Sequence, residues 1–472
     1  MLKRFLFPTN PNGVFISVIL LVVRIVFGIL MMNHGIDKWA NYQELSTVFP
    51  DPLGIGSPLS LGLAIFGELA CSMAFIIGFL YRLAMIPMIF TMCVAFFIVH
   101  GNDPFAVKEL AFVYLVDEAI AGFKGTASVA DMQAFDYWCN GDIALWKKVA
   151  NQLKLRLAMR IVKVNPTLAK QKAEEAVQGG VLTSADRDIL INQGLSNELT
   201  RMFEWGDCGM NASLITMLEG FKDPRLPLYV TKNQAAVTCE DGSTIEEGTK
   251  YLGVRGGCNL PSKPNQWGNF SKVICTYTTA FPVMKVAEGY FLRAEGALRG
   301  WSMGGSAKDL YEEGIRISIK NELAYKGSIA GVTSISDAEI DAYLNGTSGQ
   351  IDFVDPVKAE NSIKAMNTLG VKWDEGASKE EKLQRIITQK WIALYPDGPE
   401  GWSEYRRTGY PELIPVVVNG SNGTIDTELQ VRRLPYTRDE KINNPDGVAS
   451  GIAALGGADN GGTKLWWDKR DR

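Results

Sequence analysis

The sequence predicts a mainly α-helical protein: an N-terminal transmembrane bundle of three to four helices, then a tetratricopeptide-like helical-repeat domain with long loops. Charge density supports this prediction first. Residues 1–116 hold six basic and six acidic side chains, roughly half the density of the remaining 356 residues. The long apolar runs also lie before residue 100, and amphipathic helical patterns follow Asp117. This change in composition indicates a change of solvent from lipid to water, so we place the domains at residues 1–116 and 117–472.

Three apolar runs in the first domain approach the length of a bilayer core, which about 20 helical residues span. They occupy residues 14–32, 59–80 and 83–99. A fourth run, residues 110–116, has only seven apolar residues. We therefore expect three bilayer-length helices and a fourth that is shortened or continues into polar sequence near Asp117. A signal peptide is the alternative for the first run, but Arg24 lies inside it and no A-x-A cleavage site follows.

Four polar side chains in or beside these runs form a predicted membrane polar cluster: Arg24, His34, Glu68 and His100. An ionisable group inside a membrane is unfavourable and is normally paired. We therefore expect Arg24 and Glu68 to approach each other inside the bundle, with His34 or His100 near one end. An ion pair that only fixes helix packing is the alternative to a functional cluster.

Spaced motifs in the first domain resemble the DoxX family. They lie at residues 24–28, 33–35 with Lys38, 50–60 with 67–69, and 99–105 with 108–110. The resemblance implies a small four-helix inner-membrane protein associated with quinone-dependent or redox-linked oxidoreductase systems. The short fourth apolar run departs from that family's pattern.

Several enzyme classes find no support in the second domain. Both histidines precede residue 117, which removes Ser-His-Asp, Cys-His and His-ligated metal chemistry from residues 117–472. The seven cysteines contain no C-x-x-C pair, and no phosphate-binding glycine motif occurs. We therefore expect no metal and no cofactor, and the lack of a basic run argues against a nucleic-acid partner. Paired carboxylates leave a glycoside hydrolase as an open alternative.

Three helix-pair patterns with small residues at tetratricopeptide spacing predict the repeat domain. The first copy comprises Trp146, Val149, Ala150 and Leu153, then Ala169, Ala173 and Ala176. The second comprises Ala294 and Ala297, then Ala307, Tyr311 and Gly314. A looser third copy covers residues 382–395, then Gly401, Tyr405 and Thr408.

Long segments rich in Gly, Pro, Asn and Thr separate the repeats, at residues 183–280, 327–378 and 415–465. Large loops on a rigid helical frame commonly form binding surfaces. Sugar binding needs aromatic faces beside polar groups that fix orientation. The predicted ligand contacts, all in the first segment, are Trp205, Tyr251, Arg255 and Trp267. The alternative is that Trp205 and Trp267 cap the helical core.

Motifs along the second domain resemble the SusD/RagB family, at residues 151–161, 222–227, 282–295, 389–395, 433–436 and 461–468. The resemblance implies a surface lipoprotein of the outer membrane that binds nutrients without cleaving them. The implied partners are an oligosaccharide or peptide ligand, a SusC-type TonB-dependent transporter and membrane lipid.

The second domain departs from this family at its start. We find no counterpart of the family's lipid-anchored cysteine or of its first repeat helices, and the resemblance begins mid-domain near Asp117. The implied locations of the two domains, inner membrane and cell surface, also differ. A fused reading frame is our interpretation, and an evolved two-domain protein is the alternative.

Overall fold

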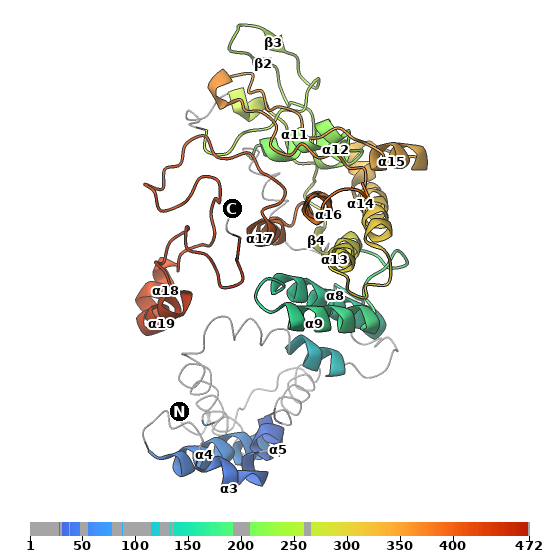
Figure 1. Cartoon of the computed structure of the whole chain (residues 1–472). Helices are drawn as coiled ribbons and strands as arrows, with labels where there is room; N and C mark the ends of the chain where they lie inside the picture. Colours follow the sequence, from blue (N-terminus) through green and yellow to red (C-terminus); the bar gives the residue numbers. More distant parts are fainter. Residues whose placement is uncertain are drawn as a thin grey trace, which may run out of the picture. The chain divides into compact units, whose positions relative to one another are not determined.

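The computed structural model describes residues 28, 31–36, 38–47, 55–77, 87, 115–122, 133, 136–191, 208–258 and 266–470. The chain divides into two compact units. One comprises Met1–Lys108 and Tyr436–Asp459, and the other comprises Glu109–Pro435 and Asn460–Arg472. Helices predominate in the described part of both units (Figure 1), which confirms the mainly α-helical prediction.

The described helices of the first unit include one apolar segment of bilayer length. The elements are α3 (Tyr42–Leu45), α4 (Ser57–Ile65), η1 (Phe66–Ala70), α5 (Cys71–Ile77), α18 (Arg438–Asn443) and α19 (Pro445–Leu455). The helices α4, η1 and α5 run on as 21 residues with a mean hydropathy of 1.9. Length and composition suffice for this helix to cross a membrane, and it coincides with the predicted run at 59–80. The run at 83–99 and most of 14–32 lie outside the described residues.

The start of the second unit bears on the predicted fourth membrane helix. Residues 115–122 are helical and include Asp117. Most of the predicted apolar run at 110–116 lies outside the described residues, so the fourth membrane helix stays a prediction.

Three helix pairs form the frame of the second unit, and each coincides with one predicted repeat. They are α8 (Ile143–Arg160) with α9 (Pro166–Gly179), α13 (Val286–Leu298) with α14 (Ala307–Ala330), and α16 (Lys379–Leu394) with α17 (Gly398–Thr408). Local sequence explains where several helices begin. Asn165 caps α9 with Pro166 following it, and Ser378 and Glu381 form a capping box at α16.

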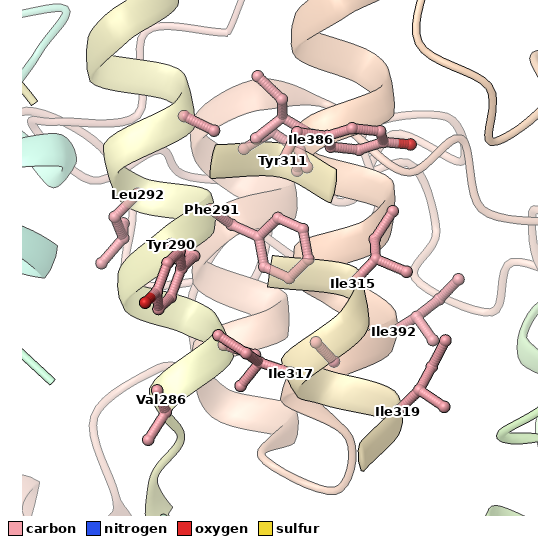
Figure 2. Packing of buried hydrophobic residues seen from close by; sticks show 14 of the residues in the cluster. Val286, Tyr290, Phe291, Leu292, Tyr311, Ile315, Ile317, Ile319, Ile386 and Ile392 are labelled. Atoms are coloured by element: carbon pink, nitrogen blue, oxygen red, sulfur yellow. The ribbon is translucent and has the colours of Figure 1, made fainter. Parts of the chain in front are cut away.

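The core of this unit lies between α13, α14 and α16. Figure 2 shows apolar side chains of α13 and α14 pointing toward one another, with Ile386 and Ile392 of α16 in the same cluster. The rings of Phe291 and Tyr311 meet edge to face with centroids 6.4 Å apart. A Cβ on Gly314 would lie 3.1 Å from the Phe291 ring, so the predicted small residue lets α13 and α14 approach closely.

The segments between the pairs carry small elements of their own. They hold β1 (Ile189–Ile191), α11 (Ala212–Phe221), α12 (Leu226–Tyr229), β2 (Val237–Thr238), β3 (Thr244–Ile245), η4 (Gln266–Asn269), β4 (Phe281–Met284), α15 (Asp337–Leu344) and η5 (Ala359–Asn361). Strand β1 pairs antiparallel with β4, placing Ile189 opposite Met284. The β1–β4 pair therefore holds the two ends of the long segment between these strands next to each other. A second antiparallel pair joins β2 and β3.

A buried network of charges ties the three helix pairs together. Its members are Arg156 and Arg160 of α8, Glu288 and Glu295 of α13, Lys390 of α16, and Glu400, Glu404 and Arg407 of α17. Arg407 binds both oxygens of Glu295, at 2.7 and 2.6 Å. Burial alone would raise the pKa of Glu295, but the Arg407 and Arg299 guanidiniums hold that pKa well below its usual range.

Removing Arg407 should be strongly destabilising because it leaves Glu295 and Glu404 buried with one fewer cation. We expect Arg407→Met to lower the free energy of unfolding by about 3–5 kcal/mol. The control is Arg316→Met, because Arg316 pairs with the exposed Asp341 and its loss should cost less than about 1 kcal/mol. Urea unfolding of the detergent-solubilised chain measures both, and equal losses would contradict a special role for the buried network.

Candidate functional site

Parts of the three long segments meet in the second unit. Val417 N, in the third segment, donates to Gly256 O in the first segment (2.9 Å). Ile414 N, just before the third segment, donates to Ser213 Oγ, also in the first segment (3.0 Å). Ile351 N donates to Thr216 O (3.2 Å), which joins the second segment to α11. The prediction that these segments are loops on a helical frame therefore holds for their described parts, and the frame brings them together.

Trp267 lies in the interior of this loop assembly. The residue belongs to η4 and is only 8% exposed, and it packs with Val237 and Phe270. Its indole N–H donates to Asp355 Oδ2 at 3.1 Å. The expectation of an exposed stacking face at Trp267 is therefore wrong. Packing with Val237 and Phe270 buries the ring, and the Asp355 carboxylate of the second long segment satisfies the buried indole N–H.

Arg255 is half-buried and already bound to the protein. Its Nε donates to Pro415 O and its Nη1 donates to Asn361 O, both at 2.9 Å. Burial lowers the pKa of Arg255. The predicted site residues Arg255 and Trp267 are thus linked through the second long segment. Arg255 binds the main chain of Asn361, whose side chain donates to the same Asp355 carboxylate that accepts from Trp267.

Tyr251 packs elsewhere in the second unit. Tyr251 is half-buried and packs against the main core, where burial, helped by Glu219, raises its pKa. Trp205 lies outside the described residues.

Among the described residues of the second unit, two exposed aromatic rings were not predicted from the sequence. Tyr277 is 63% exposed on a turn in which Thr276 N donates to Thr279 Oγ1 at 2.7 Å. Tyr137 is exposed beside the stacked rings of Trp138 and Trp146. The only sequence signal for Tyr277 was a ring flanked by threonines inside the long first segment, since solvent exposure cannot be read from local sequence.

The membrane polar cluster is only partly within the described residues. Glu68 is buried in the π-helical turn η1, and its Oε2 lies 2.5 Å from Lys38 Nζ. His34 is exposed, whereas Arg24 and His100 lie outside the described residues. A Cβ on Gly35 would come within 2.7 Å of Leu69 N, so the helical segment at 31–36 crosses η1 closely at this ion pair. Glu68 is therefore paired with Lys38, a partner that the sequence analysis did not predict.

The described carboxylates fall into two groups. Burial raises the pKa of Asp188, Glu219 and Asp397, whereas the glutamates of the helical frame shift in the other direction. The buried carboxylates Glu288, Glu295 and Glu404 are bound by cations of the helical frame, and attraction to those cations lowers the pKa of each against the opposing effect of burial. A glycosidase acid needs the opposite shift beside an open cleft. Across the described ranges, no cluster of three or more His, Cys, Asp and Glu side chains forms a metal site.

Lys326 of α14 lies in a cage of three tyrosine rings. Its Nζ is 5.6, 5.5 and 5.2 Å from the ring centroids of Tyr229, Tyr325 and Tyr395. Lys326 is 0% exposed, and its Nζ has no hydrogen-bond partner among the described residues. Burial, helped by Lys285, lowers the pKa of Lys326 to about 8, although Glu322 and Cys275 oppose that change. The cage joins α12, α14 and the end of α16.

The helical frame and the loops gathered on it define a helical-repeat protein with large loop insertions. A family model described as Susd and RagB outer membrane lipoprotein matches residues 110–468, so the chain belongs to the SusD-like family. The DoxX family model matches residues 19–101. Both resemblances seen in the sequence are therefore confirmed, and both associate the chain with membranes.

Solved structures agree with this membership. A chitin-binding SusD homologue from Flavobacterium johnsoniae is 38% identical, with a TM-score of 0.67 over 77% of this chain and 72% of that chain. A SusD homologue from Bacteroides vulgatus is 34% identical, with a TM-score of 0.67 over 77% and 71%. A SusD-like protein from Bacteroides thetaiotaomicron is 31% identical, with a TM-score of 0.68 over 88% and 87%. No curated protein matches the chain significantly.

Truncating Trp267 should destabilise the loop assembly, because its ring is buried and hydrogen-bonded. We expect Trp267→Ala to lower the free energy of unfolding by about 3–5 kcal/mol. Trp267→Phe keeps most of the ring and loses only the bond to Asp355, so about 1–3 kcal/mol is expected. Tyr277→Ala is the exposed control and should change stability by about 0.5 kcal/mol or less. A Trp267→Ala protein that unfolds at the wild-type urea concentration would argue against this placement.

The caged lysine should make stability depend on pH. Between pH 8 and 10.5 the unfolded chain holds the Lys326 proton and the folded chain does not, so raising the pH through this window favours the folded state. The gain should reach about 2–3 kcal/mol. Lys326→Met removes this contribution. At pH 7 only the wild-type protein buries the charged lysine, so any excess of the variant's free energy of unfolding over that of wild type should shrink as the pH rises to 10. A difference between the two proteins that stays constant over this range would contradict the lowered pKa.

Proposed function

We propose that residues 117–472 bind an oligosaccharide, or a peptide, for import with a SusC-type TonB-dependent transporter at the outer membrane. One observation supports this most: the loops meet on a helical frame, in a chain that is 38% identical to a chitin-binding SusD homologue over 77% of its length. The exposed Tyr277 ring, held on a hydrogen-bonded turn, is the kind of apolar face on which a sugar ring stacks. Residues 1–116 form the membrane domain in this proposal.

Chito-oligosaccharides are the first ligands to test, because that relative is described as binding chitin. Titration calorimetry of the full chain with chitohexaose, maltohexaose, cellohexaose and a mixed peptide pool should give saturable binding to one class, with a Kd on the order of 0.1 mM. No reducing sugar should be released. Release of reducing ends by a monodisperse preparation would favour a glycoside hydrolase, and the lack of any binding would contradict the proposal.

A second candidate function, for the N-terminal unit, is association with a quinone-dependent oxidoreductase system of the inner membrane. The DoxX match and the buried Lys38–Glu68 pair favour it. Separating inner and outer membranes by density distinguishes the two candidates. Surface-exposed chain in the outer membrane supports nutrient binding, and chain confined to the inner membrane supports the second function.

We also propose that the chain joins pieces of two genes, because its two family matches meet near residue 110 and imply different membranes. Sequencing source DNA across codons 114–120 tests this. Two separate open reading frames in the source would mean that the join arose when the sequence was assembled, and one uninterrupted frame would mean that the fusion exists in the genome.

A further inference from the structure

We propose that Arg255 is a positioning residue that locks three separate loops into one ligand-binding face without contacting the ligand itself. This inference rests on the proposed nutrient-binding function. It also replaces the expectation, from sequence, that the guanidinium of Arg255 binds the ligand.

The two hydrogen bonds of Arg255 span long stretches of chain. Nε donates to Pro415 O, 160 residues away in sequence, and Nη1 donates to Asn361 O, 106 residues away. Both acceptors are main-chain carbonyls, so the bonds depend on the path of each loop and not on its side chains. Two carbonyls that would otherwise need water thereby receive donors from one side chain. Arg255 thus joins the first loop to the second and to the third.

The backbone that follows Arg255 lies directly against the third loop. Val417 N donates to Gly256 O at 2.9 Å, and Val418 N donates to Gly257 O at 3.2 Å. Gly257 has a φ of +72°, and a Cβ there would come 2.8 Å from the Cβ of Val416. Only glycine fits this conformation and this approach without strain. The loop register around Arg255 is therefore narrowly defined.

The second loop is held from its other side by the buried Trp267. Asp355 Oδ2 accepts from Trp267 Nε1 at 3.1 Å and from Asn361 Nδ2 at 2.7 Å. Asp355 Oδ1 accepts from the main-chain N–H groups of Val357 and Lys358. Asp355 and Asn361 are both buried. Arg255 therefore completes a hydrogen-bonded chain that runs from the loop core, through Asp355 and Asn361, to the third loop.

The physical effect of such a clamp is preorganisation. Loops that are already ordered lose less conformational entropy when a ligand binds, so affinity rises without any new contact. Without Arg255, the second and third loops keep only their main-chain bonds, and the ligand must order them. The two donors that bind Pro415 and Asn361 are not free for a ligand in this arrangement.

The experiment compares Arg255→Ala with a matched control, Arg293→Ala. Arg293 also donates to two main-chain carbonyls, Met303 O (2.8 Å) and Gly304 O (3.2 Å), but it lies on α13 in the helical frame. Arg255→Lys, which restores a cation with fewer donors, serves as the conservative variant and as the test protein if Arg255→Ala does not fold. Chitohexaose is the probe, titrated into each full-length variant, and amide hydrogen exchange is measured with and without it.

We expect Arg255→Ala to weaken chitohexaose binding about 10-fold, Arg255→Lys to lie between it and wild type, and Arg293→Ala to bind like wild type. In Arg255→Ala without ligand, the amides of Ile363, Val417 and Val418 should exchange faster, and the probe should slow them again. Weaker binding with unchanged exchange would mean that Arg255 contacts the ligand directly, and wild-type exchange and affinity would also overturn the proposal. Absence of binding by the wild-type chain overturns the proposed function instead, while exchange still decides whether the clamp exists.

Discussion

The buried ionic network between α8, α13, α16 and α17 constrains the rest of the second unit. Buried charges must face partners with good geometry, because a single unpaired charge in the interior is strongly unfavourable. Glu295 binds Arg407, which joins α13 to α17, and Glu400 binds Arg160, which joins α17 to α8. This network constrains how the helix pairs pack, together with close apolar contacts such as Phe291 on Gly314. It therefore defines the frame from which the loops extend.

The loops gain order from the frame step by step. The β1–β4 pair joins the two ends of the first segment, and the Lys326 cage ties α12 of that segment to α14 and to the end of α16. Farther out, polar groups of one loop satisfy those of another, as Trp267 does with Asp355. Long loops without secondary structure remain ordered only when their buried polar groups find such partners.

The membrane-associated unit follows the same rule in a medium of lower polarity. Glu68 is buried in an apolar helix and Lys38 lies within reach, at the point where Gly35 permits close helix crossing. A π-helical turn carries Glu68, and such turns occur frequently at functional sites. In both units, then, a charge taken out of water is accompanied by a partner, and small residues allow the approach.

Local patterns in the sequence determined the mainly helical class, the three helix pairs and several helix starts. Periodicity, capping residues such as Ser378 and charge density all act over a few neighbouring residues, so they can be read directly. Tertiary structure alone decided the roles of individual site residues. Whether Trp267 is buried, which carbonyls Arg255 binds and which rings surround Lys326 depend on segments up to 160 residues away in sequence. No local signal encodes such partners, because burial and hydrogen bonding at these positions result from how distant segments pack.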